Sequence, residues 1–314
     1  MEITASLVKE LREKTGAGMM DCKKALAEVG GDMEQAVDYL RKKGLAAAAK
    51  KAGRIASEGL VGAYIAETGK IGAMVEINCE TDFVARNPEF VDLISDLARQ
   101  AAEKATTPEG TGEDLLAQPF VTDAAQTVND VLNQKVAKIG EKIDFRRYAR
   151  FQAEGNNMIG SYIHLGGKIG VLVELEANLD IAQLPEARDL ARDVAMQIAA
   201  SNPTFVRREE VPSAQIEAER KILAEQEDIK SKPEAVRPKI VEGRINKYFE
   251  QVCLLEQAYI KDPSQTVSDM LRVRGGALNA MVTVRRFTRY VLGEGIEKRQ
   301  EDFAAEVMAQ MGQK

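Results

Sequence analysis

The chain has 314 residues, of which 45% are hydrophobic and 29% charged, and its formal net charge is −6. This length predicts two or three domains of ordinary globular composition. The net acidity disfavours a broad nucleic-acid surface, and no apolar run approaches the roughly 18 residues of a membrane span. Residues Met1–Thr4 lack the basic region with which a secretory signal begins, and the three cysteines are widely spaced. We therefore expect a cytoplasmic protein without disulfides.

The sequence shows few signs of catalytic chemistry. Its one histidine, His164, has no nucleophile-elbow pattern near it, and the common phosphate-loop, dinucleotide, zinc-protease and calcium-loop motifs do not occur. The remaining enzymatic alternative is a phosphohydrolase with Glu76, Glu80 and Asp82 around a metal ion. We therefore expect a binding or regulatory protein that is not an enzyme and uses no cofactor.

Residues 1–54 predict a small module of three helices followed by a basic, alanine-rich helical linker. The caps and stops of the three helices are Thr4, Gly16, Asp21, Asp32 and Gly44. Met19 and Met20 lie in the glycine-flanked loop between the first two helices. Two flexible thioethers there favour an adaptable contact surface. The alternative is that both side chains fill the small core of the module.

Residues 55–293 contain one pattern twice, which predicts a core of two subdomains, 55–153 and 154–293. Nine residues beginning at Gly62 recur 98 positions later, and each copy reads as a hairpin of two strands followed by two helices and a third strand. We therefore expect an α+β fold in which each half has a three-stranded antiparallel sheet. The recurring residues are Gly62, Tyr64, Ile65, Gly69, Lys70, Ile71, Gly72, Val75 and Glu76.

The second copy carries an insertion between its two helices. The offset rises from 98 to 139 by the second helix, where Thr127 matches Thr266, so 41 residues are added. The pattern from about residue 210 to about residue 258 predicts an antiparallel coiled-coil hairpin. The alternative is a separate buried pair of helices. Residues 294–314 predict a C-terminal helix. The expected seam of the hairpin contains Val241, Ile245, Tyr248, Val252 and Leu255.

The two copies differ where the second strand leads into the first helix. The first copy has Thr81-Asp82-Phe83-Val84, whereas the second has Leu179-Asp180-Ile181-Ala182. An acid followed by a large aromatic suits a wedge that is offered to another molecule. The alternative is that Thr81 or Asp82 caps the helix and that Phe83 belongs to the core. His164 also differs from its counterpart, Ala66.

Two segments carry a resemblance to a known family. Residues 11–26, LREKTGAGMMDCKKAL, and residues 76–86, EINCETDFVAR, resemble those of bacterial elongation factor Ts. The resemblance extends over the duplicated core and the hairpin to residues 293–298. It implies a ubiquitin-associated-type N-terminal module, a two-subdomain core, a coiled-coil hairpin and a C-terminal helical module. It also implies a guanine-nucleotide exchange factor that promotes GDP release from elongation factor Tu during translation elongation.

The resemblance further implies which residues contact the partner. The turn of Thr81, Asp82, Phe83 and Val84 would enter the nucleotide-binding domain of elongation factor Tu, where Asp82 would displace the magnesium ion bound to Tu. We expect contacts with GDP-bound and nucleotide-free Tu, and no contact with nucleic acid or membrane. A general protein-binding scaffold is the alternative. The other expected contact residues are His164, Arg12, Met19, Met20 and Lys23.

Overall fold

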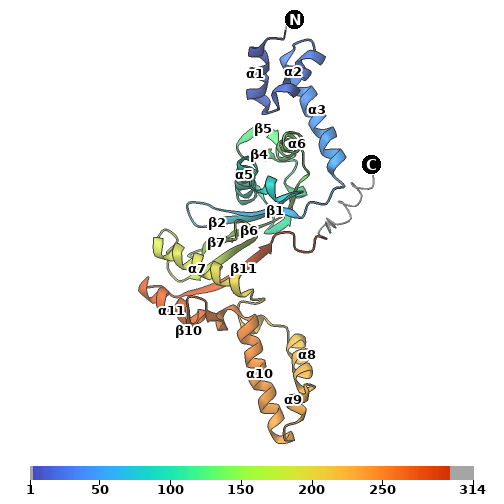
Figure 1. Ribbon diagram of the computed structural model, residues 1–314. Helices are drawn as coiled ribbons and strands as arrows, with labels where there is room; N and C mark the ends of the chain where they lie inside the picture. The colour runs from blue at the N-terminus through green and yellow to red at the C-terminus, as the bar shows by residue number, and fades with distance from the viewer. Residues whose placement is uncertain (1–2, 298–314) are drawn as a thin grey trace, which may run out of the picture.

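The computed structural model describes residues 3–297 and shows an elongated molecule with a helical module at one end and a helical hairpin at the other (Figure 1). The predicted α+β class is confirmed. The helices are α1 (Ala5–Thr15), α2 (Met19–Glu28), α3 (Met33–Lys51), α4 (Asp82–Ala85), α5 (Pro88–Lys104), α6 (Val128–Ile139), α7 (Pro185–Ser201), α8 (Ser213–Ala224), α9 (Glu227–Lys230), α10 (Arg237–Val252) and α11 (Val267–Ala277). The strands are β1 (Glu58–Ile65), β2 (Ile71–Cys79), β3 (Glu109–Thr111), β4 (Pro119–Phe120), β5 (Asp123–Thr127), β6 (Ile143–Gln152), β7 (Met158–His164), β8 (Ile169–Ala177), β9 (Ala258–Tyr259), β10 (Asp262–Thr266) and β11 (Val282–Val291).

The N-terminal module follows most of the predicted caps. The Thr4 side chain accepts a hydrogen bond from the backbone of α1, Gly16 ends that helix in the left-handed region, and Asp32 caps α3. The prediction for α2 is wrong by one turn. This helix begins at Met19, and Asp21 lies inside its first turn, where its carboxylate contacts the Lys43 ammonium at 2.7 Å. An acid in the first turn still stabilises the helix through its dipole.

The predicted stop at Gly44 is also wrong, because α3 continues through it to Lys51. Gly44 is buried against α6, where a side chain at this position would lie 3.6 Å from the Asn133 carbonyl. One turn earlier, Arg41 donates two hydrogen bonds to Asp130 on α6. Burial alone would raise the pKa of the Asp130 carboxyl. Hydrogen bonds from Thr127 and Arg41 outweigh this effect and lower the pKa below its ordinary value. Packing against α6 thus outweighs the low helix propensity of glycine, and the module and core are in direct contact.

The core contains two large antiparallel sheets, one in each half of the duplication, and each half also has a two-stranded sheet, β4-β5 or β9-β10. The second sheet has the predicted three strands, in the order β11-β8-β7. The first has four, in the order β1-β2-β6-β3, so the prediction of three strands is wrong there. The added strand, β3, pairs only three residues with the edge of β6. A strand this short has little periodicity to reveal it in the sequence.

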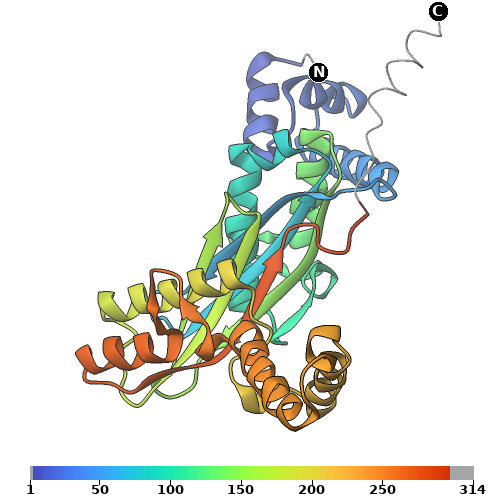
Figure 2. The ribbon, with the colours of Figure 1, turned by 60° about the horizontal axis from the view of Figure 1, so that its bottom comes forward.

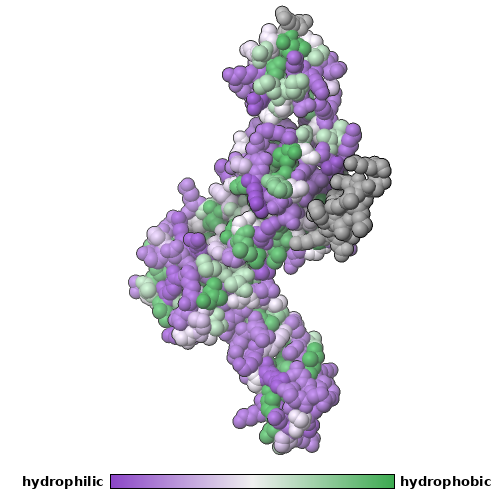
Figure 3. Space-filling view, in the orientation of Figure 1, coloured by the Kyte–Doolittle hydropathy of each residue, from purple (hydrophilic) through white to green (hydrophobic). Residues whose placement is uncertain are grey.

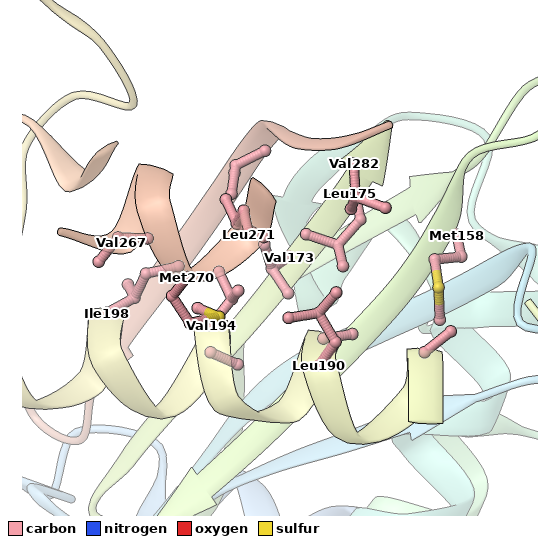
Figure 4. Close-up of a cluster of buried hydrophobic side chains, with 14 of the residues drawn as sticks. Met158, Val173, Leu175, Leu190, Val194, Ile198, Val267, Met270, Leu271 and Val282 are labelled. Carbon is pink, nitrogen blue, oxygen red and sulfur yellow. The ribbon is translucent and has the colours of Figure 1, made fainter. Parts of the chain in front are cut away.

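The two sheets and their helices stack in four layers. Helix α5 covers the outer face of the first sheet, and α7 and α11 cover the outer face of the second (Figures 1 and 2). Figure 4 shows how α7 and α11 pack on β8 in the second half. A third cluster, which includes Val61, Met74, Phe151, Ile159 and Leu172, fills the space between the sheets. The central strands β2 and β8 are therefore buried on both faces.

Repeated glycines make this close stacking possible. A Cβ added to Gly62 would lie 2.2 Å from Ile94 on α5, and one added to its counterpart Gly160 would lie 2.5 Å from Ala191 on α7. Gly72 has the same function between the sheets, because a Cβ there would lie 2.8 Å from Ile159. The glycines that define the repeat in the sequence thus mark where backbones approach other elements.

The two halves dock on each other reciprocally. The Val61 amide of β1 donates to the Gly167 carbonyl at the tip of the β7–β8 hairpin, and the matching Ile159 amide donates to Gly69 at the tip of β1–β2, both at 2.8 Å. Each hairpin tip thereby covers an edge strand of the other half. Because these two bonds are counterparts in the duplication, an approximate twofold axis relates the halves.

A buried glutamate on each central strand is held by arginines of the neighbouring strand. Glu76 is fully buried and accepts from Arg146 at 2.8 Å and Arg147 at 2.6 Å. Its counterpart, Glu174, is 1% exposed and accepts from Arg286 at 2.7 Å. In both sheets the strand register shifts by one residue beside the glutamate, which turns consecutive arginines toward it.

The insertion forms a helical hairpin of α8, α9 and α10 that projects from the second half, and its visible face is largely hydrophilic (Figures 1 and 3). The buried positions of α10 are Val241, Ile245 and Phe249, and the predicted Tyr248 and Val252 are partly buried against the same cluster. Leu255 lies beyond α10 and packs against the core of the second half. The coiled-coil character of the hairpin stays a prediction.

The end of the chain is described only as far as residue 297. A turn at Gly293 and Glu294 follows β11 and returns to the first half, where the Gly293 amide donates to Glu76 at 2.8 Å. The predicted C-terminal helix, with Phe303, Val307, Met308 and Met311, lies outside the described residues. Within residues 3–297, no helix has the length and apolar character needed to cross a membrane.

Among the described residues, replacing Glu76 by glutamine leaves Arg146 without a carboxylate partner and Arg147 with only the exposed Glu294, at 3.3 Å. We expect Glu76→Gln to lower the free energy of unfolding by about 3 kcal/mol, measured by urea denaturation. The control is Glu103→Gln, which breaks a surface pair with Arg99 and should cost less than about 0.5 kcal/mol. Equal effects of the two substitutions would show that burial of Glu76 adds nothing.

The contact between α3 and α6 also changes what truncation should do. Deletion of residues 1–54 removes the cover of α6 and the partner of Asp130. We expect the remainder to fold with a melting midpoint lowered by about 5 °C, or about 2 kcal/mol in a protein of this size. Circular dichroism measures the midpoint, and Arg41→Ala in the full chain should give a smaller drop. An unchanged melting midpoint on truncation would show that the contact of α3 with α6 adds no stability to the core.

Candidate partner-binding site

The segment of residues 80–86, here called the 80–86 turn, connects the buried end of β2 to α5. Thr81 takes an extended conformation, and its hydroxyl accepts a hydrogen bond from the Val84 amide, which starts the single-turn helix α4. Ala85 is buried and Val84 packs partly against the core of the first half. Capping and these two apolar contacts leave one side of α4 facing outward.

Two glutamates brace the turn, Glu141 from a neighbouring element and Glu80 from within the turn itself. The Glu141 carboxylate, just beyond α6, accepts from both the amide and the hydroxyl of Thr81, at 2.9 and 2.7 Å. Glu80 accepts from the Lys142 amide at 2.6 Å and pairs with Arg54 at 3.2 Å. Charged acceptors make these bonds stronger than neutral ones. The turn is therefore held in one conformation before any partner arrives.

Phe83 points away from the protein. Its side chain is 80% exposed, the highest fraction of any large hydrophobic residue in the described chain. The interpretation of Phe83 as a core residue is therefore wrong, although capping of the helix by Thr81 is confirmed. Asp82 lies beside it, half-exposed, and its carboxylate contacts the Arg86 guanidinium at 2.8 Å.

An open groove of about 870 Å³ runs beside the turn, and we call it the Phe83 groove. Two further exposed apolar side chains line it, Ile55 at 51% and Leu165 at 67% exposure. They come from the segment before β1 and from the tip of the β7–β8 hairpin. Three exposed apolar side chains around one groove, rimmed by charges that include Asp82 and Lys168, are typical of a protein-binding surface.

The same region of the second half is closed. There Lys70 contacts Asp180 at 3.1 Å, and Gln183 donates to the Thr68 carbonyl, so the β1–β2 tip is tied onto the turn. Ile181, the counterpart of Phe83, is 2% exposed. In the first half the counterpart of Lys70, Lys168, contacts Glu58 instead, at 2.8 Å. The twofold arrangement therefore gives one closed turn and one open turn.

His164 lies at the end of β7 and does not line the Phe83 groove. It is partly buried, and its Nδ1 lies 2.9 Å from the Tyr162 hydroxyl. The next residue, Leu165, has a φ of 49°, a left-handed conformation that non-glycine residues seldom adopt. The structure thus brings the tip that contains His164 close to the turn, but it is Leu165 that reaches the groove.

The residues expected on the N-terminal module form a separate surface. Arg12 and Lys23 are exposed, as are Met19 at 57% and Met20 at 64%. The alternative that both methionines fill the module core is therefore wrong. None of these four residues lines the Phe83 groove. A partner that touched both surfaces would have to extend from the module to the core.

The geometry excludes the carboxylate-metal alternative. Glu76 is buried and bound by two arginines, whereas Glu80 and Asp82 lie on the turn. Among residues 3–297, no group of three or more histidine, cysteine or acidic side chains is placed to hold a metal ion. Burial raises the pKa of the nearby Cys79 thiol to about 12, so it stays neutral and is a poor nucleophile. The site is suited to binding.

Three functional candidates escaped the sequence analysis: Ile55, Leu165 and Glu141. Ile55 and Leu165 are isolated apolar residues next to turns, and a single exposed apolar residue carries no periodic signal. Only the duplication offered a clue, because Leu165 matches the polar Glu67 and Glu141 matches Ala280.

The chain is similar to known proteins along its whole length. Residues 80–294 match the family model described as "Elongation factor TS". The chain is 49% identical to elongation factor Ts of Nostoc sp. over 316 residues, which covers 100% of this chain and 99% of that protein. It is also 49% identical to the proteins of that name from Trichlorobacter lovleyi, over 100% of both chains, and Clostridium botulinum, over 99% of both. The chain belongs to the elongation factor Ts family.

Proposed function

We propose that this protein is a cytoplasmic guanine-nucleotide exchange factor that promotes GDP release from elongation factor Tu during translation elongation. The observation that carries the proposal is the exposed Phe83 on a braced turn. Membership of the elongation factor Ts family supports the choice of partner. No covalent step is involved, so the protein accelerates a dissociation and is not an enzyme in the chemical sense.

The exposed ring supplies binding energy that only a partner can recover. Moving a phenylalanine side chain from water into an apolar site yields about 1.5–3 kcal/mol. Because the turn is already ordered, little conformational entropy is lost when Phe83 is buried. Ile55 and Leu165 extend the same apolar surface along the groove. Phe83 is therefore the anchor, inserted between apolar side chains of the nucleotide-binding domain of Tu.

Exchange follows from negative coupling between two ligands of Tu. If this chain and GDP each weaken the binding of the other, both effects have the same factor. The magnesium ion on Tu holds the diphosphate electrostatically, and Asp82 next to the ring brings a carboxylate toward that site. Within residues 3–297, Asp82 pairs only with Arg86, at 2.8 Å on a half-exposed surface, so its carboxylate is accessible. Loss of the ion then releases GDP.

Other contacts add affinity. We assign Thr81 and Val84 to the edge of the Phe83 contact, and His164 to a contact made by the β7–β8 tip. Arg12, Met19, Met20 and Lys23 form a second patch on the N-terminal module, where exposed thioethers suit an adaptable surface. This patch contacts Tu in both its GDP-bound and nucleotide-free states and keeps the factor attached while GDP leaves.

Removal of the ring tests the proposal directly. Phe83→Ala should lower the acceleration of GDP release about 100-fold, which corresponds to roughly 3 kcal/mol at a hot spot. Stopped-flow release of a fluorescent GDP from Tu measures the rate. Because the side chain is 80% exposed, the melting midpoint should not change.

The matched control is Met281→Ala, which removes an equally exposed apolar side chain (73%) that does not line the groove. It should keep the full rate. Full exchange by Phe83→Ala together with a lower melting midpoint would contradict the anchor. Consumption of nucleotide in place of its release would indicate a hydrolase.

The helical hairpin should be dispensable for GDP release. The insertion lies between elements that pack together in the first half without it, and loop length costs little entropy. The replacement must end earlier than residue 258, because Leu254 is fully buried in the core and Gln257 accepts from Gln197. Replacement of residues 210–252 by a short glycine-rich loop should leave a folded protein that accelerates GDP release.

Circular dichroism and stopped-flow measurements on one sample decide this prediction. The wild-type chain is the control for both. A folded variant without exchange activity would show that the hairpin takes part in the mechanism.

A further inference from the structure

The brace between Thr81 and Glu141 depends on one side chain that lies outside the 80–86 turn. One carboxylate accepts two hydrogen bonds from one residue, at 2.9 Å from the amide and 2.7 Å from the hydroxyl. The same hydroxyl caps α4 by accepting from Val84. Glu141 therefore holds the residue from which the helix carrying Phe83 starts.

The duplication provides an internal control for this brace. The other brace occurs in both halves: Glu80 accepts from the Lys142 amide at 2.6 Å, and its counterpart Asn178 accepts from the Met281 amide at 2.7 Å. In both halves, a residue in the left-handed region lies two positions before the donating amide. This residue is Gly140 in the first half and Asn279 in the second, so the two backbones correspond. A side-chain acceptor at this place is thus part of the shared scaffold.

The Thr81–Glu141 brace occurs only in the first half. At the matching positions the second half has Leu179 and the buried Ala280, which cannot form it. The same half buries Ile181, whereas the first half exposes Phe83. An aromatic side chain that is buried in its own core is held by packing, but an exposed one has no such support. The extra brace therefore accompanies the exposed ring.

We propose that Glu141 is a positioning residue that keeps the 80–86 turn in its partner-binding conformation, an inference that rests on the proposed exchange function. Without the carboxylate, the Thr81 amide and hydroxyl lose their common acceptor, and α4 is too short to persist alone. The turn then samples other conformations. If one tenth of molecules remain competent, the concentration needed for half-maximal exchange rises about tenfold, while the maximal rate is unchanged.

Substitution of Glu141 by glutamine tests this directly. Glutamine keeps the size of the side chain but places an amide NH₂ against one of the two donors. We expect Glu141→Gln to raise the half-saturating concentration for GDP release from Tu about tenfold, with a maximal rate within about twofold of wild type. Glu141→Asp keeps the charge on a shorter side chain and should give an intermediate effect. It replaces the glutamine variant as the test if that variant is poorly folded.

The matched control is Glu210→Gln. Glu210 also accepts from a backbone amide, that of Val206 at 2.8 Å, but in the neck of the helical hairpin away from the groove. It should leave both the half-saturating concentration and the maximal rate unchanged. In the Phe83→Ala background, Glu141→Gln should have no further effect, because the residue acts through the ring.

A spectroscopic measurement separates this proposal from the exchange function. With 4-fluorophenylalanine at the nine phenylalanine positions, the ¹⁹F resonance missing in Phe83→Leu identifies the ring at position 83. In the free protein, Glu141→Gln should shift or broaden that resonance, and Glu210→Gln should not.

Each outcome decides between the two ideas. An unchanged Phe83 resonance in Glu141→Gln overturns the positioning role, whatever the exchange rates are. A changed resonance with an unchanged half-saturating concentration overturns it as well, because the order of the turn then has no bearing on binding. So does a tenfold effect that persists without the ring. A changed resonance in a protein whose wild-type form does not accelerate GDP release supports the positioning and refutes the proposed function.

Discussion

The junction between the two sheets depends on one buried carboxylate and its cations. Glu76 accepts from Arg146 and Arg147 on β6 and from the Gly293 amide beyond β11, so it joins the two halves of the duplication. Arg147 also lies over the Tyr290 ring of the other half, and the matching Arg286 lies over Phe151. Charges with several partners and stacking on both sides can remain between packed sheets, where an unpaired charge could not. This reciprocal interface fixes where each hairpin tip meets the opposite turn.

The candidate site is a consequence of that arrangement. Docking of the sheets brings the tip of each β-hairpin beside the strand-to-helix turn of the other half. On one side, Lys70 and Gln183 tie the tip to the turn, and Ile181 is buried. On the other side the equivalent ties are absent from the described contacts, and the groove stays open beside Phe83. A single scaffold thus provides a closed turn and an open turn, which differ in a few side chains.

The open turn combines exposure with order, and this combination favours the burial of its aromatic side chain against another molecule. An exposed aromatic on a mobile loop would lose much of its binding energy when it became ordered. Here capping by Thr81, the acceptors Glu80 and Glu141, and the buried Ala85 supply the order in advance. The N-terminal module reaches the same half of the core through α3, which packs along α6 and contacts Asp130. Both proposed contact surfaces therefore have α6 as a neighbour or support.

The sequence by itself determined the caps at Thr4 and Asp32, the duplication, the insertion and the difference between the two turns, because these signals depend on neighbouring residues or on a repeated pattern. It did not determine that α3 passes Gly44, since the packing that stabilises this helix involves α6, and Arg41 and Asp130 are 89 positions apart. It also left the exposure of Phe83 open, because a capped turn looks the same whether its aromatic residue points inward or outward. Only the tertiary structure joined Phe83 with Ile55, Leu165 and Glu141, since close packing between sheets decides which distant segments meet.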